Sequence, residues 1–221
     1  VVVGVVVVVV AVVAAVVVAV VGVVVVAVAV AGVCAVADVV VVAVPLGTMQ
    51  NIFQQMSNVI SSATIVTDVG STKGSVIEAA KAGLGRCLPQ FVPGHPIAGS
   101  EKNGVEAGFA ELYQNKKVIL TPLPENSQSS IDQISDMWQQ CGAHIEYLSV
   151  IQHDKVLAAT SHLPHLLAFS MVTYLSGLND HDEIFKYAAG GFRDFTRIAS
   201  SDSVMWRDVC LANGDALIEL I

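Results

Sequence analysis

Basic residues are scarce in this chain of 221 residues, which has 11 Lys and Arg against 19 Asp and Glu and a formal net charge of -8. The largest basic cluster is the pair Lys116 and Lys117. A surface that follows nucleic-acid phosphates needs a denser patch of Lys and Arg. The composition therefore argues against a nucleic-acid partner.

Cysteine is also sparse. The four cysteines are far apart and form no C-x-x-C pair: Cys34, Cys87, Cys141 and Cys210. This spacing matches neither a zinc site nor a disulfide framework, so we predict no bound metal and a reducing, cytoplasmic environment. A G-x-S-x-G motif is absent too, which disfavours an α/β-hydrolase.

Residues 1–44 lack almost all chemical variety. They contain 29 Val, 10 Ala and 3 Gly besides Cys34 and Asp38, and no Lys or Arg precedes Lys73. A membrane span needs at least ~18 apolar residues, but natural spans favour Leu, Ile and Phe with basic flanks. A signal peptide is disfavoured because the charged first segment is missing. We favour a third interpretation, in which the true side chains of this stretch are not recorded and Val and Ala stand for them.

From residue 37 onward, the apolar pattern predicts alternating strands and helices. Strands are expected at residues 37–45, 63–67, 91–92, 117–120 and 144–148, and helices at residues 48–61, 75–82 and 130–140. Such alternation is typical of βαβ units. We therefore predict the α/β class, with a Rossmann-like, mostly parallel sheet in a dinucleotide-binding domain over residues 1–150.

After residue 150 the strand pattern stops. One long helix interrupted near Pro164 is expected over residues 151–175, and further helical segments over residues 185–199 and 204–220. We predict that residues 151–221 form an all-helical domain for dimerisation and substrate contacts. The apolar ending ALIELI without a polar cap suggests that this domain is incomplete at its C-terminal end.

Gly4 follows three valines, at the place where a G-x-G-x-x-G loop would begin to bind a dinucleotide pyrophosphate. The later glycines of that motif would be Val6 and Val9, so the motif is absent as written. Taken literally, these β-branched residues would block the close approach of a cofactor.

His95 lies between Gly94 and Pro96 in the segment 93–104, which we expect to be a loop that follows a parallel strand. Loops at this edge of an α/β sheet bind ligands, and Ser71 should reach the same edge from another strand. A hydrogen bond between Ser71 and His95 could position a base. The alternative is a loop histidine that only bonds the backbone.

Asp154, His162 and His165 fall within about 80° of arc if residues 151–175 form a regular helix, so they could meet one ligand. A metal site is disfavoured because a proline interrupts H-L-P-H. The stronger alternative is a histidine pair at a domain interface.

Arg193 and Arg197 share a helix face in a region with few charges, which suggests recognition of a carboxylate. The alternative is that either arginine pairs with Asp194 or Asp202.

Four strings resemble the prephenate dehydrogenase, or cyclohexadienyl dehydrogenase, family of tyrosine biosynthesis: DVGSTKG, FVPGHPIAGSEKNGVE, ATSHLPHLLAF and GGFRDFTRIASSDSVMW. The resemblance covers residues 37–221. It implies oxidative decarboxylation of prephenate to 4-hydroxyphenylpyruvate, with hydride transfer to NAD or NADP, by a homodimer built through the helical domain. Arogenate in place of prephenate is the alternative within the family. If the Val and Ala residues are literal, the alternative is a non-catalytic, membrane-tethered binding module; otherwise we expect no membrane partner.

The resemblance also implies roles for individual residues. His95 is the base that takes the substrate hydroxyl proton, and Ser71 hydrogen-bonds both that hydroxyl and His95. We assign five residues to substrate binding: Arg197, His165, His162, Ser100 and Glu101. We assign Gly4, Pro45 and Asp68 to the cofactor. Asp154, Asp194 and Trp206 are expected to frame or gate the pocket, with a purely structural role as the alternative.

Overall fold

The computed structural model describes residues 6–10, 23–26, 34, 37–98 and 108–221. Its first part contains a five-stranded parallel sheet in the order β2-β1-β3-β4-β5. The strands are β1 Val6–Val10, β2 Val23–Val26, β3 Val39–Ala43, β4 Ile65–Asp68 and β5 Phe91–Val92. The strand order reverses between β1 and β3, which is the switch point of a Rossmann-like sheet. The predicted fold class is confirmed.

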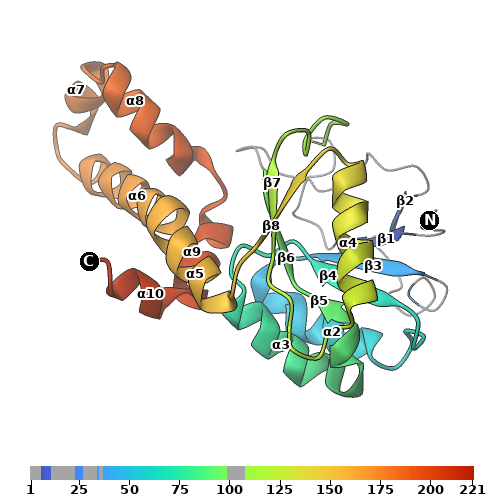
Figure 1. Cartoon of the computed structure of the whole chain (residues 1–221). Coiled ribbons are helices and arrows are strands. Elements are labelled where there is room, and N and C mark those ends of the chain that lie inside the picture. Colours follow the sequence, from blue (N-terminus) through green and yellow to red (C-terminus); the bar gives the residue numbers. More distant parts are fainter. Residues whose placement is uncertain (1–5, 11–22, 27–33, 35–36, 99–107) are drawn as a thin grey trace.

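Strand β3 is buried on both faces, as its continuous apolar sequence predicts. Val40 and Val42 pack in one core cluster with helices α2 Met49–Met56 and α3 Gly74–Leu84. The alternate residues of β3 pack in a second cluster with helix α4 Gln128–Gln140. Helices α2 and α3 approach closely at Gly83, where an added Cβ would lie 2.5 Å from the Cβ of Phe53. The sheet is therefore covered on both sides (Figure 1).

A second sheet contains β6 Gly94–Ile97, β7 Lys117–Leu120 and β8 His144–Tyr147, with β6 antiparallel to β7 and β7 parallel to β8. The expectation of a loop over residues 93–104 is wrong at its beginning, because His95 lies within β6 and is paired with Ile119. Pro96 suggested a loop, but an edge strand tolerates a residue without a backbone N–H, and β6 lies at the edge of this sheet.

The helical part starts with α5 Val150–Leu157, whose first turn is closed by a capping box between Ser149 and Gln152. The helix continues through a π-helical turn, η4 Ala158–His162, into α6 Leu163–Ser176. The interruption expected near Pro164 is this π turn, and the proline lies at the start of α6, where its missing N–H costs little.

Shorter elements complete the chain. Helices α7 to α10 and the 3-10 turn η5 follow α6: α7 His181–Lys186, α8 Gly190–Thr196, η5 Arg197–Ser200, α9 Ser203–Ala212 and α10 Gly214–Ile218. Two 3-10 turns, η1 Leu46–Thr48 and η2 Gly85–Gln90, follow β3 and α3. The helical part extends away from the sheets, and α6, α7 and α8 lie furthest from them (Figure 1).

Candidate active site

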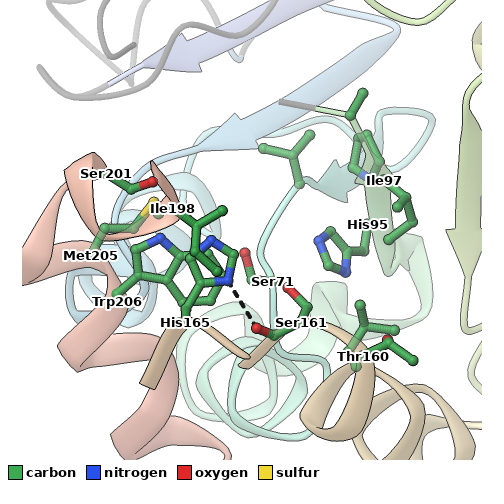
Figure 2. Close-up of a pocket in the computed structure, with 14 residues that line it drawn as sticks. Ser71, His95, Ile97, Thr160, Ser161, His165, Ile198, Ser201, Met205 and Trp206 are labelled. Atoms are coloured by element: carbon green, nitrogen blue, oxygen red, sulfur yellow. Dashed lines mark hydrogen bonds between the residues drawn. The ribbon is translucent and has the colours of Figure 1, made fainter. Parts of the chain in front are cut away.

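A cavity of about 630 Å³ has walls from both parts of the chain. Ser71 reaches it from the turn after β4, and His95 reaches it from β6. His165 and Trp206 form the opposite wall from α6 and α9 (Figure 2). The carboxyl end of a parallel strand thus meets the helical part at this cavity, which is where α/β sheets bind ligands.

A chain of hydrogen bonds begins at His95 and leads away from the cavity. Nδ1 of His95 lies 2.9 Å from Nε2 of His153, and Nδ1 of His153 lies 2.8 Å from Oδ1 of Asp154. His153 is fully buried and His95 is nearly so. The network determines the proton positions, because a carboxylate can only accept and Nδ1 of His153 must therefore donate.

With both rings neutral, Nε2 of His153 accepts the Nδ1–H of His95. Nε2 of His95 is then the unprotonated nitrogen, which is the form that a general base requires. Burial lowers the pKa of His95 well below its ordinary value, and the nearby charge of Lys73 lowers it further. The ring is therefore neutral and able to accept a proton at physiological pH.

Asp154 also closes the N-terminus of helix α3. Its Oδ1 accepts the backbone N–H of Lys73 and its Oδ2 accepts that of Gly74, both at 2.8 Å. Burial raises the pKa of Asp154, but the hydrogen bonds from His153 and from these two amides outweigh it and hold the pKa below its ordinary value. Asp154 therefore stays ionised and links α3 to the His153–His95 pair.

Asp68, which we assigned to the cofactor, does not line the cavity. Its side chain is fully buried, and its oxygens accept from the N–H of Gly70, the N–H of Gly94 and Nζ of Lys73. The position after a strand suggested ligand contact, but the carboxylate turns inward because these three donors surround it. Asp68 is a structural group in this site.

The expectation that Asp154, His162 and His165 meet one ligand is wrong. His165 lines the cavity, stacked on Trp206 with ring centroids 3.5 Å apart, and its Nδ1 donates to the carbonyl oxygen of Ser161 (Figure 2). Asp154 and His162 contact protein groups instead. The calculation assumed a regular α-helix, whereas the intervening π turn has more residues per turn and changes the angle between its two ends.

His162 is fully buried beside the cavity, so its assignment to direct substrate binding is not supported. Its Nδ1 accepts from Nδ2 of Asn213 at 3.0 Å, and the same amide nitrogen donates to the carbonyl oxygen of Asp154 at 2.8 Å. Nε2 of His162 is buried against the Ser71 backbone without the alignment of a hydrogen bond. Asn213 and His162 thus brace the segment that carries Ser71.

The remaining predicted residues fall into three groups. Arg197 and Asp194 are exposed on η5 and α8, and the residues of this region that line the cavity are Ile198 and Ser201. Pro45 is half-buried and lies two residues after the end of β3, the strand beside the switch point. Gly4, Ser100 and Glu101 lie outside the described residues.

Acid is expected to destabilise the fold through His162. Burial lowers its pKa to about 4, so the unfolded chain, with an ordinary value near ~6.5, binds the proton more readily. Stability is therefore fully present above pH ~6.5 and is lost as the pH falls toward ~4, by on the order of 3 kcal/mol. Denaturant unfolding across this range measures the loss. The free energy of unfolding should depend less steeply on pH in His162→Gln and as in the wild type in His144→Gln, which replaces an exposed histidine. Equal slopes in the wild type and both variants would contradict the assignment.

His153, Lys73 and Asn213 are the groups that the sequence reasoning missed. A usable signal existed for His153, because it directly precedes Asp154 in the first turn of a helix with a capping-box sequence. Lys73 stands only five residues after Asp68, across a turn. Asn213 offers no such signal, since its partners are 51 and 59 residues away.

Comparison with known proteins shows the family of the chain. The family model described as prephenate dehydrogenase, nucleotide-binding domain, matches residues 9–147, and the model described as prephenate dehydrogenase, dimerization domain, matches residues 149–221. The chain belongs to the prephenate dehydrogenase family.

Relatives within the prephenate dehydrogenase family include a cyclohexadienyl dehydrogenase of Zymomonas mobilis, 40% identical over 180 residues, and a prephenate dehydrogenase of Bacillus subtilis, 41% identical over 165 residues. These matches cover 80% and 72% of this chain but 61% and 43% of those proteins. The crystal structure of a prephenate dehydrogenase from A. aeolicus, in complex with hydroxyphenyl propionate and NAD+, is 41% identical with a TM-score of 0.76. That match covers 83% of this chain and 63% of the other.

Proposed function

We propose that this protein oxidises prephenate or arogenate with NAD or NADP and releases the ring carboxylate as CO2, a step of tyrosine biosynthesis. The observation that carries the proposal is the buried His95–His153–Asp154 chain, which ends at the cavity beside Ser71. The chain spans 43 to 63% of the length of the relatives named above, and the activity is therefore a proposal.

The proton path follows from the tautomers. Nε2 of His95 takes the proton of the substrate's ring hydroxyl as that carbon becomes a carbonyl, and Ser71 on the same wall orients the hydroxyl. The imidazolium that forms on His95 donates from Nδ1 to His153, and the Asp154 carboxylate stabilises the charged pair. A bound nicotinamide would supply the hydride acceptor for the same carbon. Loss of CO2 leaves the electron pair of the broken C–C bond in the ring, which becomes a phenolate, and the proton held on Nε2 of His95 returns to its oxygen to give the phenol.

The described residues fit a nicotinamide dinucleotide. The switch point between β1 and β3 is the place where Rossmann-like sheets bind one. Pro45 follows β3 at this edge, and Val69 follows β4 and lines the cavity next to Ser71. We propose that Pro45 and Val69 contact the cofactor, and that Gly4 belongs to its phosphate loop. The choice between NAD and NADP rests with residues after the second strand.

The substrate carries carboxylates, and the cavity region offers groups for them. We propose that Arg197 binds one carboxylate, since it directly precedes the cavity residue Ile198, and that His165 contacts the substrate from the stacked pair with Trp206. Ser100 and Glu101 are proposed at the cavity mouth because they follow the cavity residues at the end of β6. Asp154 and Trp206 frame the pocket, and Asp194 is proposed to act near its entrance.

We further propose a soluble, cytoplasmic homodimer that uses the helical part over residues 151–221, with the boundary between domains near residue 150. The stretch Val150–Ser176 is long and apolar enough to cross a membrane by length and composition, with a mean hydropathy of 1.3. It carries His153, Asp154 and His162, however, which bond groups of the protein. Exposed apolar side chains on the helical part favour a second copy as the partner: Ile151, Leu167, Tyr174, Leu211 and Ile218.

Turnover with defined substrates tests the proposal. The protein is incubated with prephenate or arogenate and with NAD+ or NADP+, and the reduced nicotinamide and the CO2 are both quantified. Equal amounts of the two products with at least one substrate support the proposal, and the ratio of kcat/KM values identifies the preferred substrate and cofactor. Absence of turnover in all four combinations, with a protein that binds the dinucleotide, would contradict it.

A further inference from the structure

A buried ion pair holds the residue that precedes His95. Nζ of Lys73 donates to Oδ2 of Asp68 and to the carbonyl oxygen of Gly94, each at 2.5 Å, and both charged side chains are 0% exposed. Oδ1 of Asp68 accepts the N–H of Gly94 at 3.1 Å. Both polar backbone atoms of Gly94 are thus bonded by one ion pair. Such a pair joins the end of β4 and the start of α3 to the first residue of β6.

Burying a charged pair is an energetically unfavourable way to hold a backbone segment in place. Removing two charges from water costs several kcal/mol for each ion, and apolar residues of similar size often stabilise a core as well or better. Gly94 also lies close to the end of β4, where an added Cβ would make a tight contact of 3.1 Å with the carbonyl oxygen of Asp68. The contact therefore combines a close backbone approach with a buried charge, directly next to His95.

We propose that the Asp68–Lys73 pair is a positioning element for His95, which fixes the backbone of β6 at Gly94 and keeps the ammonium of Lys73 beside the ring. The proposal rests on the proposed role of His95 as the base. Neither Asp68 nor Lys73 lines the cavity, so the pair acts through His95.

The charge of Lys73 has a predictable effect on this ring. Among the described residues, the titratable groups around His95 come from three elements: Asp68 and Lys73 on the β4–α3 connection, His153 and Asp154 on α5, and His162 on η4. A positive neighbour disfavours a protonated histidine, and the charge of Lys73 contributes to the lowered pKa of His95. Removal of the ammonium should therefore raise the pKa of His95.

NMR titration of the His95 ring tests this without substrate or cofactor. In Lys73→Met, the pKa of His95 is expected to rise by about one unit, because one positive neighbour is lost and Asp68 remains. The double variant Asp68→Asn with Lys73→Met removes both charges, so a smaller rise is expected. Lys81→Met removes the exposed pair with Glu78 on the same helix and should leave the titration unchanged.

Two further measurements separate positioning from general stability. Amide exchange at Gly94 and His95 should accelerate in both Lys73 variants, and the acid limb of kcat/KM should move to higher pH by the same amount as the NMR pKa. If the Lys73→Met protein does not fold, the same measurements on the double variant test the proposal. The proposal would be wrong if a folded Lys73 variant showed the same pKa and the same amide exchange rate of His95 as the wild-type protein. Failure of the proposed dehydrogenase activity would be distinct, since the wild-type protein would then not turn over while the NMR shift persisted.

Discussion

Replacement of His95 by Asn is expected to lower kcat by about 100- to 10,000-fold while substrate binding persists. Asn keeps a polar side chain of similar reach toward His153, but it cannot take a proton from the substrate hydroxyl. Steady-state kinetics and a direct binding measurement with the substrate check the two parts of this expectation separately.

The matched control for His95 is His144→Asn, which changes an exposed histidine on β8 in the same sheet. It should leave kcat and KM unchanged. A His95→Asn protein with wild-type kcat would remove His95 from the mechanism. A variant that lost substrate binding with its kcat unchanged would assign His95 to binding instead.

Asp154→Asn is expected to reduce kcat by up to roughly 10,000-fold, the effect of the aspartate-to-asparagine change in a Ser-His-Asp triad. The carboxylate accepts three hydrogen bonds, from His153, Lys73 and Gly74. An amide has one acceptor oxygen, so at least one of these donors is left without a partner, and the histidine pair loses the negative charge that stabilises its protonated form. The donor that is left without a partner should lower the free energy of unfolding by about 1–3 kcal/mol.

The pH dependence of Asp154→Asn has a defined sign. In the folded protein the pKa of Asp154 is below its ordinary value. The ionised carboxylate therefore stabilises the fold at any pH above that ordinary pKa. This contribution is lost as the pH falls through the folded-state pKa, and the stability difference between wild type and variant should shrink in acid. Asp136→Asn, an exposed change on α4, is the control. A variant with wild-type kcat would show that Asp154 only caps helix α3.

Local patterns determined much of the fold. The continuous apolar run of β3 predicted a strand, which is buried on both faces, and the apolar pattern of residues 48–61 predicted helix α2, whose buried Met49, Phe53 and Met56 pack on the sheet. These predictions succeed because the periods of strands and helices depend on neighbouring residues alone. The same reasoning predicted that His95 and Ser71 lie near one edge because each follows a strand of the parallel sheet, and both line the cavity, although His95 lies in β6 and not in a loop.

The tertiary structure decided which polar groups turn toward the cavity. Asp68 and Ser71 stand three residues apart after the same strand, yet Asp68 is enclosed by Lys73 and two backbone amides, whereas Ser71 lines the cavity. His153 joins His95 across 58 residues. The π turn at η4 changes the angle between Asp154 and the two histidines that follow it, of which His165 lines the cavity. Local sequence cannot specify these outcomes, because each depends on hydrogen-bond partners that only the packed elements bring together.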